Sequence, residues 1–133
     1  MEARPYEPKD FEQVQKWAAQ YGSEIREHQY PKTGFIIDGF GAYFLYSTDS
    51  SCCWLENLIA NKEAEPGLKG LAIEILTAAI LNKAKELGFK VAYATTDNMS
   101  VVARARQHGA TITPLQILLT KDLEGHHEDA QGE

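Results

Sequence analysis

The chain has 133 residues, and 13 Lys and Arg stand against 19 Asp and Glu, which gives a formal net charge of −6. This length predicts one domain, and a 44% apolar fraction is ordinary for a globular protein. The acidic balance excludes a nucleic-acid binder that depends on overall positive charge. No apolar run reaches the roughly 18 residues that a membrane-spanning helix needs.

The first half of the sequence alternates short apolar runs with turn residues. Asp10 is expected to cap a helix, with Gln13 three residues on as in a capping box. Asp38 and Gly39 between two apolar runs predict a β-hairpin turn. The expected elements are, in chain order, a strand over 3–6, a helix over 10–22, a loop or short helix over 23–32, strands over 35–37 and 42–46, and a strand over 52–60. Alternation along this last strand places Trp54, Leu58 and Ala60 on one face.

The second half of the sequence is dominated by one long helix. Apolar residues recur at helical spacing over residues 68–87, and Gly88 is a typical residue to end such a helix. The remaining expected elements are a buried strand over 89–95, a helix over 99–108, and strand-like segments over 111–113 and 116–120. This order predicts an α/β fold, a three-layer sandwich with helices on both faces of a mixed, mostly antiparallel sheet.

The charge is concentrated at the end of the chain. Five acidic residues follow Lys121 with no Lys or Arg among them, so residues 1–121 carry a net charge of only about −1. We therefore expect a single domain over residues 1–121 and an acidic, disordered tail over residues 122–133. His126 and His127 belong to this tail, and we predict no metal site there.

The two cysteines, Cys52 and Cys53, are neighbours in sequence. A disulfide between adjacent residues is strained, so free thiols in a reducing compartment are expected. The first residues also lack the basic-then-apolar pattern of a signal peptide. We predict a cytoplasmic protein without a membrane partner.

Two glycines, Gly67 and Gly70, stand where the strand over 52–60 leads into the long helix. Positions without side chains leave backbone N–H groups accessible, and the positive end of the helix dipole favours an anion, so the segment suits a pyrophosphate. The alternative is that Gly67 only makes the turn and Gly70 only permits packing. Neither a Walker A motif nor a Gly-x-Gly-x-x-Gly motif is present.

The segment Gly67-Leu68-Lys69-Gly70-Leu71-Ala72 resembles the Gln/Arg-x-x-Gly-x-Gly/Ala acetyl-CoA loop of the GNAT superfamily of N-acetyltransferases. Asn98, followed eleven residues later by Gly109-Ala110, is similar to the Asn and the Gly-Phe pair of that family. The opening from Arg4 to Asp10 is similar to its Arg-Pro-x-x-x-x-Asp start. In size and in its ending the chain is similar to small, divergent GNAT-like proteins encoded by tailed bacteriophages.

The resemblance implies a GNAT-like sandwich whose central β-α-β crossover binds acetyl-CoA. It implies an N-acetyltransferase in which an unknown amine, on a small molecule or a protein, attacks the acetyl group directly. Glu56, on the strand that runs beside the acetyl group, is the predicted general base, and the alternative for it is a plain surface position. The cofactor-binding residues that it implies are Leu58, Ile59, Ala60, Gly67, Leu68, Lys69, Gly70, Leu71, Ala72 and Asn98.

Departures from the family pattern favour a second interpretation, a catalytically degenerate GNAT-fold binding protein or virion-associated protein. Gly67 stands where the family has Gln or Arg, and Ala105 stands where it often has the tyrosine that protonates the leaving thiolate. Tyr46 or Tyr93 is the candidate replacement for that acid. Sheet edges in a shortened fold suggest a homodimer. If the chain is phage-encoded, its location is the host cytoplasm or the virion.

Overall fold

The computed structural model describes residues 1–96, 98–113 and 119–124. The chain forms two compact units, residues 1–95 and residues 96–133. The first unit holds the sheet and two α-helices, and the described residues of the second unit hold one helix, α3 (Met99–Gln107). The expectation of a single domain over 1–121 followed by a tail stays a prediction. In the described part of the chain no helix has the length and apolarity to cross a membrane.

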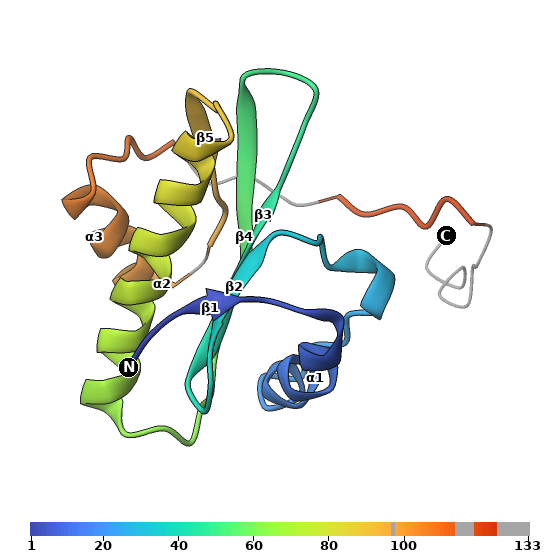
Figure 1. Cartoon of the computed structure of the whole chain (residues 1–133), viewed down its shortest axis with the longest axis vertical. Coiled ribbons are helices and arrows are strands. Elements are labelled where there is room, and N and C mark those ends of the chain that lie inside the picture. The colour runs from blue at the N-terminus through green and yellow to red at the C-terminus, as the bar shows by residue number, and fades with distance from the viewer. Residues whose placement is uncertain (97, 114–118, 125–133) are drawn as a thin grey trace. The chain divides into compact units, whose positions relative to one another are not determined.

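A five-stranded mixed sheet is the centre of the first unit, with its strands in the order β1-β2-β3-β4-β5 (Figure 1). Adjacent strands are antiparallel except for β4 and β5, which are parallel. The predicted mixed, mostly antiparallel sheet is therefore confirmed. The strands are β1 (Arg4–Pro5), β2 (Gly34–Ile37), β3 (Gly41–Tyr46), β4 (Cys52–Ala60) and β5 (Val91–Tyr93).

Two helices, α1 (Phe11–Ala19) and α2 (Pro66–Glu86), cover opposite faces of this sheet (Figure 1). The α1-side core consists of Tyr6, Val14, Trp17, Ala18, Tyr30, Ile36, Ala42, Phe44 and Ile59. The α2-side core consists of Ile37, Tyr43, Leu45, Cys53, Leu55, Ala72, Leu76, Ile80 and Ala84. Successive residues of β3 alternate between the two cores, as the pleat of a strand requires. This arrangement confirms the predicted α/β three-layer sandwich.

The long helix buries a narrower stripe than the sequence predicts. Its four fully buried residues are spaced by four and face the sheet, whereas Leu68, Leu71 and Leu87 are exposed. The helix also begins at Pro66, two residues before the expected start. Proline is favoured in the first turn of a helix because its missing N–H has no intrahelical acceptor there.

The predicted hairpin is confirmed, with a three-residue connection of Asp38, Gly39 and Phe40 between β2 and β3. Gly39 has a φ of 84°, a conformation that costs glycine little. Gly41 opens β3 where the strands pass unusually close, because a Cβ there would lie 2.6 Å from the carbonyl oxygen of Ile59. Glycine is therefore required at this position by the approach of β4.

Several predictions for the second half of the chain are wrong. The strand expected to be buried over 89–95 is the three-residue β5, which is exposed and, among the described residues, pairs only with Cys52–Trp54 of β4. Residues 111–113 and 119–120 form no strand, and Ile112 is exposed, so it has no apolar surface on which a strand would pack. Residues 114–118 lie outside the described residues. The helix expected over 99–108 is confirmed as α3.

The neighbouring cysteines lie on opposite faces of β4, as alternation predicts. Cys53 is fully buried in the α2-side core and Cys52 is half-buried, and both are free thiols. Burial raises the pKa of Cys53, so this thiol is neutral and acts as a small apolar residue.

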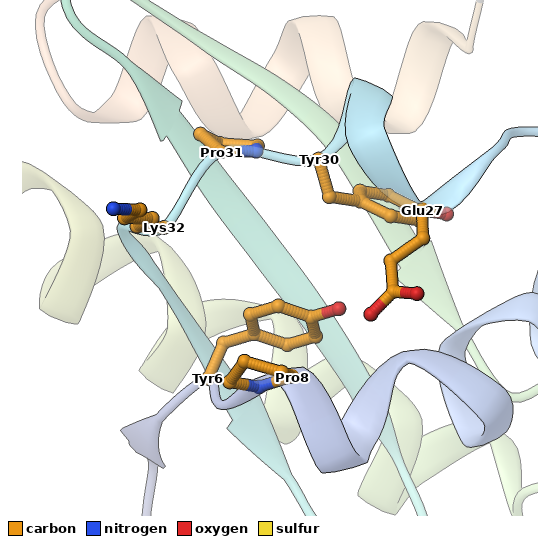
Figure 2. A pocket seen from close by; sticks show the side chains of 6 residues that line it. All are labelled: Tyr6, Pro8, Glu27, Tyr30, Pro31 and Lys32. Atoms are coloured by element: carbon orange, nitrogen blue, oxygen red, sulfur yellow. The ribbon is translucent and has the colours of Figure 1, made fainter.

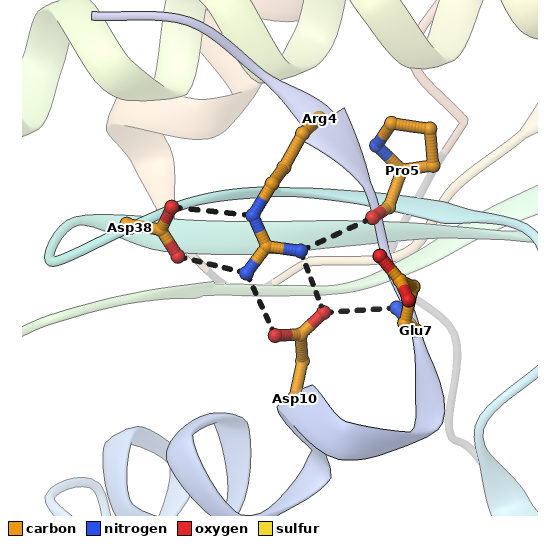
Figure 3. Close-up of polar contacts among 5 residues, drawn as sticks. All are labelled: Arg4, Pro5, Glu7, Asp10 and Asp38. Carbon is orange, nitrogen blue, oxygen red and sulfur yellow. Dashed lines mark hydrogen bonds and ion pairs between the residues drawn. The ribbon is translucent and has the colours of Figure 1, made fainter.

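The start of the chain is fastened to the sheet by Arg4 (Figure 3). Its guanidinium donates to both carboxylate oxygens of Asp10, at 2.9 and 2.7 Å, and to both of Asp38, at 3.2 and 2.8 Å. Asp10 also accepts from the backbone N–H of Glu7 at 2.9 Å. The predicted capping box with Gln13 is wrong, because the Asp10 carboxylate turns back to these donors and makes no cap hydrogen bond to α1.

We predict that Asp10→Ala lowers the free energy of unfolding by about 2 kcal/mol at pH 7, because it leaves charged hydrogen bonds of a half-buried Arg4 unmade. Asp38→Ala should cost less than about 1 kcal/mol, since the Asp38 side chain is 76% exposed. The Arg4 hydrogen bonds hold the pKa of Asp10 below its ordinary value of 3.8. Its contribution is therefore complete above that value and is lost as pH falls through the folded pKa. Denaturant titration at pH 7 and at pH 3 measures both effects, and equal losses in the two variants would contradict the assignment.

Candidate functional site

The central feature of the site is a β-bulge in β4. Glu56 pairs with Phe44 and Ile59 pairs with Ala42, so β4 has one residue more than β3 between these two pairs. Asn57, inside the bulge, has a φ of 59°. Asparagine is one of the few residues other than glycine that adopt this left-handed conformation readily. Sequence patterning does not predict the bulge, although an asparagine inside an apolar strand is a weak signal for it.

The bulge reverses which residues of β4 point to each face of the sheet. Before it, Leu55 belongs to the α2-side core, and after it Leu58 packs against that same core while Ile59 belongs to the α1-side core. Strict alternation would give Leu58 and Ile59 the reverse positions. The prediction that Trp54, Leu58 and Ala60 share one face is therefore wrong, because the inserted residue shifts the alternation by one.

One edge of β4 is left without a strand partner beyond its first residues. β5 pairs only with Cys52–Trp54, and no other described strand lies along the same edge of β4. The predicted cofactor residues Leu58, Ile59 and Ala60 are all on this unpaired stretch. A free strand edge presents backbone N–H and C=O groups to a ligand. The carbonyl of Ala60 already accepts from the Tyr21 hydroxyl at 2.8 Å, which leaves the groups nearer the bulge as the better candidates.

Glu56, the predicted base, lies half-buried where β4 and β5 separate. Thr95, two residues after β5, donates its backbone N–H and its hydroxyl to the two carboxylate oxygens, at 3.0 and 2.7 Å. These bonds fix the orientation of the carboxylate. Each oxygen of an ionised carboxylate has a second lone pair, so the group can still accept a proton.

Of the two tyrosines considered as the acid, Tyr46 lies at the bulge. Its hydroxyl accepts a hydrogen bond from the Asn57 amide and donates to the carbonyl of Gln29 at 3.0 Å. Burial raises the pKa of Tyr46, so it is a protonated phenol at neutral pH. Tyr93 is exposed and packs instead on Trp54, at 5.1 Å between ring centroids.

The first turn of α2 binds an anion that belongs to the chain itself. The Glu65 carboxylate accepts from the backbone N–H of Gly67 at 3.0 Å and from that of Leu68 at 2.9 Å. These bonds lower the pKa of Glu65, which is therefore charged at neutral pH. The backbone N–H of Lys69 donates to the Glu65 carbonyl at 2.8 Å. The turn thus has the geometry to hold anionic oxygens, and its donors already have a partner.

The remaining residues of the predicted loop lie inside the helix, where N–H groups donate to carbonyls four residues earlier. Ala72 is buried in the α2-side core and Leu71 is exposed. Gly70 has open space beside it, since a Cβ there would meet nothing within 4 Å. Packing by the described residues therefore does not require a glycine at this position. That residues 67–72 contact a cofactor stays a prediction.

Asn98 belongs to the second unit and caps α3. Its side-chain oxygen accepts from the backbone N–H of Ser100 at 2.9 Å and from the Ser100 hydroxyl at 2.7 Å. This cap accounts for an asparagine at this position, and its predicted contact with a cofactor is untested. Over residues 1–96, 98–113 and 119–124, no three His, Cys, Asp or Glu side chains gather as metal ligands would. His126 and His127 lie outside these residues.

Comparison with known proteins gives a clear result for the fold. No protein-family model matches the sequence, and no curated protein matches it. Among solved structures, the chain is similar to a GNAT-family acetyltransferase from Streptococcus pneumoniae, with a TM-score of 0.66, 18% identity, and coverage of 90% of this chain and 98% of that one.

Two further similar structures were solved in complex with coenzyme A. One is a protein from Mycobacterium tuberculosis, with a TM-score of 0.66, 14% identity, and coverage of 86% of this chain and 75% of that one. The other is N-acetylglutamate synthase from Neisseria gonorrhoeae, with a TM-score of 0.60, 19% identity, and coverage of 78% of this chain and 27% of that one. The chain has the fold of the GNAT acetyltransferases.

We predict that Glu65→Ala lowers the melting temperature, because two N–H groups of the first turn lose their acceptor. Glu65→Gln should lower it less, since an amide oxygen still accepts one hydrogen bond. The matched control is Glu63→Gln, an exposed residue of the same loop whose side chain caps nothing. Thermal melts of the three variants at pH 7 measure the effect, and a Glu65→Ala melt equal to that of the wild type would rule out the cap.

Proposed function

We propose that the protein binds acetyl-CoA and transfers its acetyl group to an amine. The observation that carries the proposal is the edge of β4 beyond Trp54, which has no partner among the described strands and is followed along the chain by the N–H groups at the start of α2. A free strand edge suits the amide groups of pantetheine, and a helix start suits a pyrophosphate. Similar folds that carry coenzyme A support the choice of ligand.

The residues at the start of α2 fit an anionic ligand, provided that the Glu65 carboxylate leaves the backbone N–H groups it occupies. The N–H groups of Gly67 and Leu68 hold carboxylate oxygens in the structure, and the space beside Gly70 is open. A pyrophosphate and the Glu65 carboxylate cannot share these donors, because both are anions. Cofactor binding therefore requires the exposed Glu65 side chain to turn away.

Bound acetyl-CoA supplies the activated thioester, and the chain supplies groups that move protons. Glu56, oriented by Thr95, takes the proton that the attacking amine releases, either directly or through an ordered water. Tyr46, a protonated phenol at the bulge, is the candidate acid in place of the tyrosine that Ala105 replaces. Glu56 precedes Asn57 in the bulge, and the Asn57 side-chain amide donates to the Tyr46 hydroxyl on the neighbouring strand β3.

The alternative function is that of a GNAT-fold binding protein without catalysis. One observation favours it, since Ala105 stands where the family often has the tyrosine that protonates the leaving thiolate. The two functions differ in turnover and can share cofactor binding. The cytoplasmic location, a homodimer and the likeness to bacteriophage proteins stay predictions.

We predict that coenzyme A raises the melting temperature, since a ligand at a hundredfold excess over Kd stabilises the fold by about 2.7 kcal/mol. Gly70→Asp should abolish this shift, because its carboxylate points into the open space beside the helix and repels the pyrophosphate. Ala78→Asp is the matched control, as it puts the same charge on an exposed position two turns further along α2. No shift at millimolar coenzyme A would overturn both proposed functions.

The same titration tests the competition with Glu65. Glu65→Gln should tighten coenzyme A binding by roughly two- to fivefold, the effect of removing one charge at a helix start. Glu63→Gln should leave the affinity unchanged. An unchanged affinity in Glu65→Gln would place the pyrophosphate elsewhere.

We predict that Glu56→Gln lowers kcat by about 10², the typical contribution of a general base, with little change in coenzyme A affinity. Mass spectrometry of a panel of amines incubated with acetyl-CoA measures turnover, and Glu63→Gln is again the control. Unchanged turnover in Glu56→Gln would remove this residue from the mechanism. Coenzyme A binding without turnover of any amine in the wild type would support the non-catalytic alternative.

A further inference from the structure

Residues 61–65, the connection between β4 and α2, join the two parts of the proposed cofactor site. Three backbone N–H groups of the connection have acceptors in or beside it. Asn61 donates to the carbonyl of Phe40 at 2.7 Å, and Ala64 donates to the carbonyl of Asn61 at 3.1 Å. Glu63 donates to the side-chain oxygen of Asn61 at 3.1 Å. Hydrogen bonds therefore hold the backbone of the connection in one arrangement.

Gln20, the half-buried residue that follows α1, supplies the acceptor for a fourth N–H group. Its side-chain oxygen accepts from the backbone N–H of Lys62 at 2.7 Å. Its side-chain nitrogen donates to the side-chain oxygen of Asn61, 41 residues away in the sequence, at 3.0 Å. A primary amide carries an acceptor and donors on one carbon, so a single side chain makes both bonds. Gln20 thus joins α1 to the connection at two adjacent residues.

Asn61 and Tyr21 complete this junction. The Asn61 side-chain nitrogen donates to the carbonyl of Gly39, in the hairpin between β2 and β3, at 3.1 Å. The hydroxyl of Tyr21, the residue after Gln20, donates to the carbonyl of Ala60 at the end of β4, at 2.8 Å. The connection is therefore fastened on one side to the end of α1 and on the other to the hairpin.

The two ends of α1 have different surroundings. Near its start, the chain borders a pocket of about 320 Å³ (Figure 2). The residues that line this pocket are Tyr6, Pro8, Glu27, Tyr30, Pro31 and Lys32. Figure 2 shows the Glu27 carboxylate directed toward the Tyr6 hydroxyl, so the pocket disfavours an anionic ligand. The end of α1 that bears on an anionic cofactor is therefore the other one, where Gln20 holds the connection.

Coenzyme A, under the proposed function, reaches from the edge of β4 to the start of α2 as one covalent molecule. Two linked contacts bind more tightly than either alone only where the two sites keep the spacing that the linker spans. The connection sets this spacing. Cofactor binding requires the Glu65 side chain to turn away, and the hydrogen bonds of residues 61–64 do not involve that side chain. The backbone frame therefore stays in place when the cap is released.

We propose that Gln20 is a positioning residue for the cofactor. Through its bonds to Lys62 and Asn61 it fixes the start of α2 relative to the edge of β4, and this role rests on the proposed function. Gln20 acts through the connection and does not itself contact the ligand. It therefore matters for a ligand that spans both parts of the site and matters little for a ligand that uses the helix start alone.

The test is a calorimetric or NMR titration of the full chain with dephospho-coenzyme A and with ADP. The two ligands share the pyrophosphate and the adenosine, and only the first has the pantetheine arm. Gln20→Met removes both hydrogen bonds and keeps the length of the side chain. It should weaken dephospho-coenzyme A binding about five- to tenfold and ADP binding less than about twofold, because only the first ligand links the two sites. Gln13→Met, the same change at an exposed position of α1, should alter neither affinity.

Two further measurements separate positioning from a general loss of stability. Gln20→Ala, which removes the same bonds without adding an apolar group, should show the same selective loss. Amide exchange at Lys62, measured without ligand, should become faster in both Gln20 variants, because the N–H of Lys62 loses its acceptor. Unchanged exchange at Lys62 would overturn the proposal.

The outcomes also separate this role of Gln20 from the proposed function. If the wild type binds coenzyme A and the Gln20 variants bind dephospho-coenzyme A as it does, the role of Gln20 falls and the proposed function stands. Equal losses for dephospho-coenzyme A and ADP, or no advantage of the first ligand over the second in the wild type, have the same consequence. If the wild type does not bind coenzyme A at millimolar concentration, both fall.

Discussion

The left-handed conformation of Asn57 is the constraint on which the candidate site depends. One inserted residue lets Leu58 serve the α2-side core and Ile59 the α1-side core, so a single strand seals both faces of the sheet. The same insertion breaks the regular pairing of β4, whose other edge has no strand partner beyond Trp54 among the described residues. The bulge therefore sets the packing of both cores, and the short β5 leaves open the edge of β4 that continues past it.

The start of α2 shows how a helix end can be stable and still suited to a ligand. Its N–H groups need an acceptor, and Glu65 supplies one from the next residue outside the helix. Because this carboxylate is fully exposed, releasing it costs little burial, and water or a phosphate can replace it. The cap therefore weakens anion binding without blocking it, because a ligand must displace the Glu65 carboxylate. The size of this weakening depends on the charge of Glu65.

Local patterning in the sequence predicts much of the fold, whereas contacts between distant residues escape it. The bounds of β4, the hairpin at Gly39 and the long helix come from periodicity and turn residues. The bond network of Arg4 joins segments 34 residues apart, and the partner of Glu56 is 39 residues away, so no spacing rule reveals either. The Glu65 cap is predictable from the sequence, because an acidic residue before a proline is a known helix start. The strand expected over 111–113 is absent, because an apolar run alone does not supply a neighbour to pair with.

Tyr46, the candidate acid, links the bulge of β4 to the segment that precedes β2. A transferase must hold its cofactor and its acceptor in fixed relation, since small displacements of reacting groups cost large factors in rate. Here the Tyr46 hydroxyl accepts a hydrogen bond from the Asn57 amide in the bulge and donates one to the carbonyl of Gln29, before β2. Its ring packs against the α1-side core, so its position is set by the sheet and not by either ligand. A change at Tyr46 would therefore act on the bulge as well as on the proposed proton transfer, whereas a change at Glu65 acts on the start of α2.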